Sequence, residues 1–185
     1  MPTKPLIQAQ ARTVIESVSA VAVYEMISDL PSQSRWSSEC RGGRWISGEP
    51  AQFGARFEGN NHRDMDVVAW APVVRGDWST VCEIVSAVPG SEFAWAMLDS
   101  LGNPQQSIWS FVLSEKQNDV VLEHRFVMQE PTEGIASITA DMSAAERTQF
   151  FEEWERKVAA DLRSSVDRIR ELFTEILDEE VGRSY

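Results

Sequence analysis

One apolar stripe runs through the C-terminal part of the chain for 27 residues, from position 150 to position 176. Its members recur every three or four residues, as on one face of an α-helix, and they are Phe150, Trp154, Val158, Leu162, Val166, Ile169, Phe173 and Ile176. The sequence SAAE, which starts at Ser143, is typical of a capping box at a helix N-terminus. We therefore predict one long amphipathic helix over residues 143–180. Such a helix has to bury its stripe against a second layer.

The middle of the chain predicts that second layer, because its hydrophobic period changes from helical to two residues. Turn signals such as GEP, GNN, PG and GNP separate its segments. The predicted strands cover residues 41–47, 53–61, 78–88, 92–98, 106–114 and 119–129, and SAVPGSEF marks the clearest hairpin. The less regular stretches RDMDVVAWAPVVRG and QEPTEGIASITAD are predicted to be long loops.

The N-terminal part adds one strand and two short helical segments. Residues 1–11 are polar and contain prolines, so we expect them to be loose. Residues 12–18 alternate as a strand does. Ser19 is a typical N-cap for a short helix that ends before Pro31, and a second helical turn is expected near Trp36. Together these elements predict one α+β domain over residues 1–185, with the sheet and small helices in 12–129.

Composition and charge exclude several classes of partner. The chain carries a formal net charge of −12, which would repel nucleic acid phosphates and anionic lipid surfaces. Half of this charge lies in residues 141–181, with twelve acidic and six basic residues, as on a solvated helix face. There is no apolar run of membrane-spanning length and no signal-peptide pattern at the start. We expect a cytoplasmic protein that binds no nucleic acid and inserts into no membrane.

The parity of the predicted strands gathers aromatic side chains on one face of the sheet. In IWSFVLSE, Trp109 and Phe111 share a face with Leu113, and that face has to be the inner one. The same parity places further large side chains inside, and these are Phe93, Trp95, Met97, Leu122, His124, Phe126 and Met128. Trp78, Thr80, Cys82 and Ile84 likewise share one face. This inner face is wider than packing against a single helix requires, so it is expected to frame a hollow.

Five stretches of the sequence resemble a known superfamily. They are VIESVSAVAVYEMISDL, RWSSECRGGRWISG, FGARFEGNN, CEIVSAVPGSEFAWAM, and WSFVLSE with VVLEHRF. The chain resembles polyketide cyclase/dehydrase-like and lipid-transport-like members of the START-related (SRPBCC) helix-grip superfamily, the fold of the birch-pollen allergen. The resemblance implies a seven-stranded antiparallel curved sheet wrapped around a long C-terminal helix, with a hydrophobic cavity between them. It implies no universal catalytic residue. The long insertion at residues 62–77 departs from the family pattern, so the resemblance does not define the rim and entrance of the cavity there.

From parity and resemblance we predict a set of ligand-binding residues. They are Phe57, Trp78, Cys82, Trp95, Met97, Trp109, Phe111, His124, Phe126, Met128 and Trp154. His124 is the candidate catalytic residue, because parity places an ionisable ring among apolar neighbours. The alternative is that His124 is a core histidine whose hydrogen bonds are satisfied.

Other residues that attract attention have simpler interpretations. The resemblance implies that Trp36 and Trp45 pack the small helices onto the sheet, and Cys40 is expected to be an ordinary small residue. His62 is expected to be solvated, and Glu123 and Arg125 to form an ion pair on the outer face. The two cysteines and two histidines show no paired-ligand spacing, so no metal or other cofactor is expected.

Three functions remain open at this point. The first is binding of a small hydrophobic or aromatic molecule, lipid-like or polyketide-like, in the cavity. The second is a polyketide cyclase, aromatase or dehydrase of secondary metabolism, in which His124 would move a proton. The third is a protein that docks a partner through its acidic helix. A homodimer is compatible with each of them.

Overall fold

Seven strands form one antiparallel sheet in the spatial order β1-β7-β6-β5-β4-β3-β2. The computed structural model describes residues 4–182, and of residues 180–182 only the backbone. The strands are β1 (Ile7–Ile15), β2 (Cys40–Ser47), β3 (Arg56–Arg63), β4 (Gly76–Val88), β5 (Glu92–Leu98), β6 (Pro104–Lys116) and β7 (Asp119–Met128). The helical elements are α1 (Ala20–Ser28), the 3-10 helix η1 (Leu30–Arg35), α2 (Glu133–Thr139) and α3 (Ala144–Gly182). The predicted α+β fold, with its curved seven-stranded sheet and two short helices after the first strand, is confirmed.

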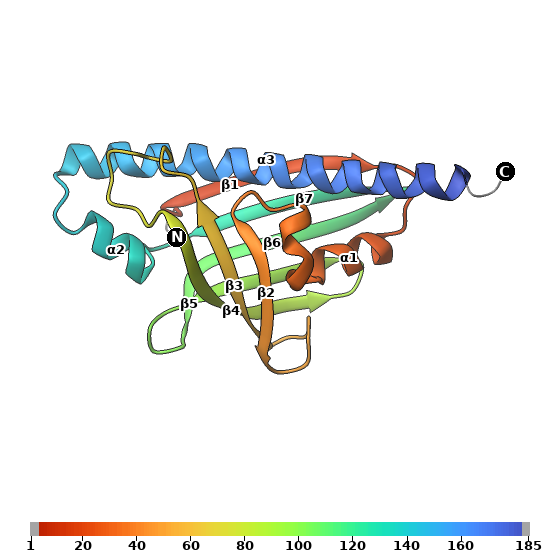
Figure 1. Cartoon of the computed structure of the whole chain (residues 1–185), viewed down its shortest axis with the longest axis horizontal. Helices are drawn as coiled ribbons and strands as arrows, with labels where there is room; N and C mark the ends of the chain where they lie inside the picture. Colours follow the sequence, from red (N-terminus) through yellow and green to blue (C-terminus); the bar gives the residue numbers. More distant parts are fainter. Residues whose placement is uncertain (1–3, 183–185) are drawn as a thin grey trace.

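The long helix α3 runs along β1 and β7 for the length of the molecule (Figure 1). Its first turn has the predicted capping box, because Ser143 Oγ accepts from Glu146 N at 3.3 Å and Glu146 Oε2 accepts from Ser143 N at 2.8 Å. The stripe from Phe150 to Phe173 is buried. Ile176, the last member predicted, is 38% exposed, because the end of α3 extends past the sheet (Figure 1).

The small helical elements close the other side of the concave face. Ser19 caps α1 as expected, its Oγ accepting from Ala22 N at 3.2 Å. Tyr24 of α1 packs edge-on against Phe93 of β5, with 6.0 Å between ring centroids. The chain then turns through η1 into β2, and Leu30 of η1 is buried. The concave face of the sheet is thus enclosed between α1 and η1 on one side and α3 on the other.

The first strand is longer than predicted. Residues 1–11 were expected to be loose, but β1 begins at Ile7, which pairs with Met128 of β7. Along β1 the buried positions alternate strictly with exposed ones, and two of them are Ala9 and Ala11. These alanines gave a weak hydrophobic signal in the sequence, yet their small side chains allow α3 to lie close to the strand.

One stretch predicted to be a long loop contains a helix instead. Within QEPTEGIASITAD the chain forms α2, whose N-cap Thr132 accepts from Ile135 N at 3.4 Å. The helix has only seven residues and contains Gly134, which lowers helix propensity. Only Ile135 and Thr139 are buried on it, so no apolar stripe marked it in the sequence. The other predicted loop, residues 63–76, contains neither helix nor strand apart from its end residues Arg63 and Gly76, which belong to β3 and β4.

Candidate ligand-binding cavity

A cavity of about 550 Å³ lies between the concave face of the sheet and α3. Strands β3 to β7 form one wall, while α3, α2 and the segment from η1 to the start of β2 form the other. Large side chains point into it because every second residue of each strand faces inward. The apolar lining includes Phe57, Trp78, Cys82, Trp95, Met97, Trp109, Phe126, Met128, Ile135, Ile138, Trp154 and Val158.

The structure brings nearly all of the predicted ligand-binding residues to this cavity. The strand residues among them line its wall as parity predicted, and Trp154 faces them from α3. Phe111 lies one layer deeper. It is fully buried behind His124 and does not belong to the lining. Whether these side chains contact a ligand stays a prediction.

His124 lines the cavity in a surrounding of aromatic rings. Its imidazole stacks on Phe111 with 3.9 Å between ring centroids, and the rings of Trp36, Trp95 and Trp109 lie 5.9–6.3 Å away. The side chain is 3% exposed, and neither ring nitrogen has a hydrogen-bond partner within the part of the chain that the structure describes. Burial lowers the pKa of His124 to about 3, since the charged form cannot be solvated there. The ring is therefore neutral at physiological pH.

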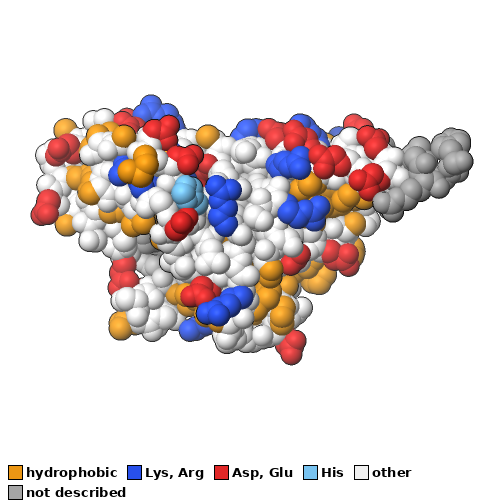
Figure 2. Space-filling view, viewed as in Figure 1, with side chains coloured by type: hydrophobic (Ala, Val, Ile, Leu, Met, Phe, Trp, Pro, Cys, Tyr) orange, Lys and Arg blue, Asp and Glu red, His pale blue; other side chains and the backbone are white. Residues whose placement is uncertain are grey.

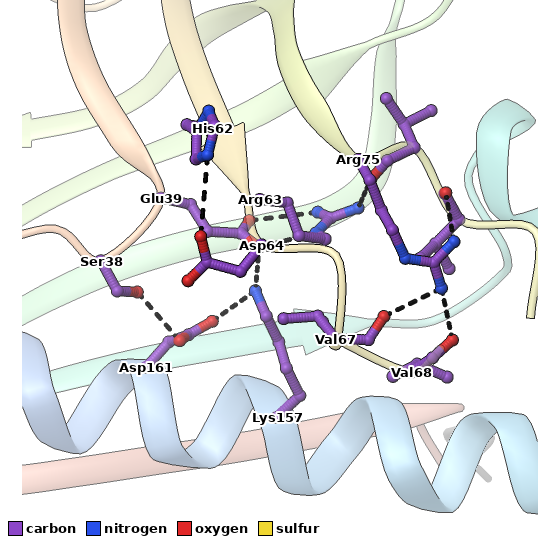
Figure 3. A network of polar contacts seen from close by, with 12 residues as sticks. Ser38, Glu39, His62, Arg63, Asp64, Val67, Val68, Arg75, Lys157 and Asp161 are labelled. Atoms are coloured by element: carbon purple, nitrogen blue, oxygen red, sulfur yellow. Dashed lines mark hydrogen bonds and ion pairs between the residues drawn. The ribbon is translucent and has the colours of Figure 1, made fainter. Parts of the chain in front are cut away.

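A charged cluster, formed by Glu39, Arg63, Lys157 and Asp161, crosses from the sheet to α3 at the cavity wall (Figure 3). Arg63 donates from Nε and Nη2 to the two oxygens of Glu39, at 2.7 and 3.1 Å. Lys157 Nζ lies 2.5 Å from Glu39 and 2.6 Å from Asp161. Ser38 Oγ donates to Asp161 at 2.9 Å. Two cations thus face two carboxylates, and the cluster adds no net charge to the cavity.

The carboxyl group of Glu39 stays ionised in this cluster. Burial by itself raises its pKa, but hydrogen bonds and charges from Arg63 and Lys157 outweigh burial, so the pKa of Glu39 lies below its ordinary value. Arg63 is 9% exposed, and its guanidinium lies over the rings of Trp78 and Trp154, at 4.4 and 4.8 Å from their centroids. Arg63 therefore combines an ion pair with two cation–π contacts.

Sequence reasoning missed this cluster, although part of it had a readable signal. Arg63 shares the inward parity of Phe57 in FEGNNHR, and Lys157 and Asp161 have the i,i+4 spacing of a helical ion pair beside the apolar stripe. Glu39 lies in the connection between η1 and β2, and no pattern in the sequence relates that connection to α3. The cluster depends on a tertiary contact between segments more than 100 residues apart.

The cavity reaches the surface where its lining residues are exposed. These are Ser38, Val74, Ser79, Ser100, Glu133 and Gly134. Ser38 lies in the connection between η1 and β2, and the others belong to the end of the 62–77 insertion, the start of β4, the β5–β6 turn and α2. The insertion, where the resemblance left the entrance undefined, thus contributes Val74 to one side of this mouth, and the β5–β6 turn and α2 contribute to the other.

Hydrogen bonds hold α2 to the β5–β6 turn across that side. The carboxylate of Glu133 accepts from the backbone N and the Oγ of Ser100, at 2.7 and 2.8 Å. The backbone N of Glu133 in turn donates to Gln105 Oε1 at 2.7 Å. Glu133 and Ser100 are both exposed, so these bonds form at the border between cavity and solvent.

The two tryptophans of the early segment differ in their environment. Trp36 is 3% exposed, packs edge-on to Phe111 and also lines the cavity, so a purely structural interpretation of it is incomplete. Its indole N–H has no partner among the described residues. Trp45 packs on Phe57, with ring centroids 5.3 Å apart, and does not line the cavity.

The remaining candidate residues lie apart from any reactive arrangement. Both cysteines are free, and burial raises the pKa of Cys40 and raises that of Cys82 to about 12, so both are thiols. His62 pairs with Asp77 at 2.7 Å and is partly exposed. Glu123 and Arg125 form the expected ion pair. Within residues 4–179 no group of three or more His, Cys, Asp or Glu side chains is arranged so that it could hold a metal ion.

A second hollow of about 410 Å³ lies outside the cavity, between η1 and α3. Its lining is mostly charged or hydroxylic, and Arg168 there is paired with Glu171 and Glu175. Figure 2 shows side chains of both charges along α3. Such exposed pairs contribute little binding energy, so this hollow is not the candidate site.

Several solved structures of other proteins are similar in fold to this chain. A polyketide cyclase-like protein of Corynebacterium glutamicum aligns with 95% of this chain and 96% of its own, at a TM-score of 0.62 and 21% identity. This chain therefore has the helix-grip fold. A Mycobacterium smegmatis protein shares the helix-grip fold at a TM-score of 0.57 and 12% identity, over 92% of this chain and 93% of that one.

The di-domain ARO/CYC StfQ of the steffimycin biosynthetic pathway also shares the helix-grip fold. It matches 94% of this chain at a TM-score of 0.64 and 8% identity, and this chain spans about half (53%) of StfQ. No protein-family model and no curated protein matches the sequence. Within residues 4–182 no helix is long and apolar enough to cross a membrane.

Proposed function

We propose that this helix-grip protein binds a small, largely aromatic molecule in the cavity between its sheet and α3. The observation that carries the proposal is the cavity itself. Its volume of about 550 Å³ falls within the range of small-molecule sites, and aromatic side chains from β3 to β7 and from α3 surround it. An apolar wall with a few placed polar groups is the usual composition of a ligand site.

Energetics supports the same proposal. If the cavity were closed and dry, its roughly 550 Å³ would cost about 13 kcal/mol at ~24 cal/mol per Å³. That cost is comparable with the whole stability of a domain. Trp78, Trp95, Trp109 and Trp154 surround this space and do not fill it. A ligand that covers these rings would recover their buried apolar area.

A cyclase reaction on a polyketide-like chain is the second candidate. It is favoured by the fold that this chain shares with StfQ, an ARO/CYC protein, and by a cavity large enough to hold a folded chain. Acid–base catalysis needs a residue that gains or loses a proton near neutral pH. His124 stays neutral there, and Glu39 is held as an ion by Arg63 and Lys157. Binding is therefore the function that the cavity supports better.

Titration with N-phenyl-1-naphthylamine, an uncharged apolar fluorophore, tests the proposal. We expect saturable binding by the folded protein with one site per chain and quenching of tryptophan emission. The variant Thr80→Phe places a ring into the cavity and should weaken binding at least tenfold. Ser110→Phe, on the outer face of β6, is the matched control and should bind normally. Binding that appears only on partial unfolding would contradict the proposal.

A further inference from the structure

His124 brings two buried polar atoms to the cavity wall without satisfying either of them. A neutral imidazole carries one N–H donor and one lone-pair acceptor. Neither finds a partner among the described residues, and buried polar groups are hydrogen-bonded in the great majority of native structures. An unpartnered polar side chain that lines a cavity is the arrangement expected of a group reserved for a ligand.

The ring is held where it is and cannot turn toward a partner elsewhere. It stacks on Phe111 at 18° between the planes, and Trp36, Trp95 and Trp109 surround it. The indole N–H groups of these tryptophans are donors, but none of them hydrogen-bonds to His124 in the described residues. Both ring nitrogens are therefore left for a partner in the cavity that His124 lines.

The charged side chains around the cavity already have partners. Arg63 and Lys157 are paired with Glu39 and Asp161 in the charged cluster, and Glu133 accepts two bonds from Ser100. A ligand with a carboxylate or an ammonium group would be buried without a counter-charge, which is costly. The electrostatics of the wall therefore favours an uncharged ligand.

We infer that the ligand is an uncharged aromatic molecule with a hydroxyl group, and that this hydroxyl forms a hydrogen bond with His124. The inference rests on the proposed function and narrows its ligand class. A hydroxyl donates and accepts, so it pairs with either ring nitrogen, whereas a carbonyl meets only the N–H. The ring system of the molecule lies against Trp95, Trp109 and Phe126, which line the cavity next to His124.

Three matched probes test this assignment by competition against N-phenyl-1-naphthylamine at pH 7. They are 2-naphthol, naphthalene and 2-naphthoate, which share one ring system and differ in the polar group. We expect 2-naphthol to bind roughly 2- to 12-fold more tightly than naphthalene, the usual range for one net hydrogen bond. We expect 2-naphthoate to bind most weakly. Equal binding of 2-naphthol and naphthalene, or a preference for 2-naphthoate, would overturn the inference.

Two variants assign the preference to His124. His124→Phe should abolish the advantage of 2-naphthol while naphthalene still binds, and His124→Gln, which keeps a donor and an acceptor, should retain part of it. A preference for 2-naphthol that survives in His124→Phe would overturn the role of His124. If no probe binds wild-type protein, the proposed function itself fails, and this outcome differs from equal binding of all probes.

A direct readout covers the case in which His124→Phe does not fold. The chain has two histidines, so ¹⁵N spectra of the imidazole rings show two residues, and His62→Asn assigns them. Addition of 2-naphthol should shift the ring nitrogens of His124 and leave those of His62 in place. Ring nitrogens of His124 that do not move at saturation would overturn the assignment.

Discussion

The imidazole of His124 lies flat on the ring of Phe111, with 3.9 Å between their centroids. This contact buries the histidine that parity had placed on the inner face of the sheet. His124, which the sequence suggested as a catalytic residue, is therefore a neutral polar group surrounded by aromatic rings.

The first prediction concerns the protonation state of His124. Because burial lowers the pKa of His124 to about 3, its ring resonances should not titrate between pH 5 and 8. NMR titration of the two histidines measures this, with His62→Asn to assign them. A midpoint for His124 near its ordinary value of 6.5 would contradict the burial described here.

The same pKa shift predicts how stability depends on pH. Between pH 6.5 and pH 3 the unfolded chain binds a proton at residue 124 that the folded chain does not bind. The free energy of unfolding should therefore fall as the pH drops, by up to about 1.4 kcal/mol per pH unit from this residue alone. Urea denaturation of wild type and His124→Gln between pH 4 and 7 isolates the effect, since the variant lacks this component. Parallel pH profiles for the two proteins would contradict it.

The charged cluster should matter more for stability than the surface ion pairs. Arg63→Met leaves Glu39 in the cavity wall with Lys157 as its remaining cationic partner, and it removes both cation–π contacts. We therefore expect a loss of about 3 kcal/mol in the free energy of unfolding. Arg44→Met is the matched control, because Arg44 is 76% exposed in its pair with Glu58. It should cost less than ~1 kcal/mol. Similar losses for both variants would show that the cluster has no special role.

The bonds between Glu133 and Ser100 predict how fast a ligand enters and leaves. Glu133→Ala releases α2 from the β5–β6 turn at the mouth of the cavity, so both rate constants for N-phenyl-1-naphthylamine should rise, by roughly fivefold if about 1 kcal/mol of closure is lost. The equilibrium affinity should change little. Stopped-flow fluorescence measures both rates, and Glu130→Ala, just before α2, is the control. Unchanged rates in Glu133→Ala would place the entrance elsewhere.

The hydrophobic periodicity of the sequence predicted the fold, because burial of one face of a strand or helix imposes that periodicity. A strand covered on one face repeats its apolar residues every two positions, and a long covered helix repeats them at 3.6, so Trp95, Trp109, Phe126 and the α3 stripe were readable without coordinates. The errors fell where that signal is weak. Ala9 and Ala11 carry little hydrophobicity, and the short α2 contains Gly134.

The polar parts of the candidate site were harder to predict. Strand parity placed His124 in the wall, but not its stacking on Phe111 or the absence of a partner among the described residues. The pairing of Glu39 with Arg63 and Lys157 joins three distant segments and depends on how α3 lies across the sheet. Patterns within one segment cannot report such contacts.

The position of a bound ligand tests the central claim most directly. With ¹³C-labelled methionine methyl groups, addition of N-phenyl-1-naphthylamine should shift Met97 and Met128, which line the cavity, and show NOEs from them to the ligand. Met65, which is 74% exposed on the loop after β3, should not respond. That pattern would locate the ligand between the sheet and α3. Saturable binding that moves Met65 and leaves Met97 and Met128 unchanged would contradict the account.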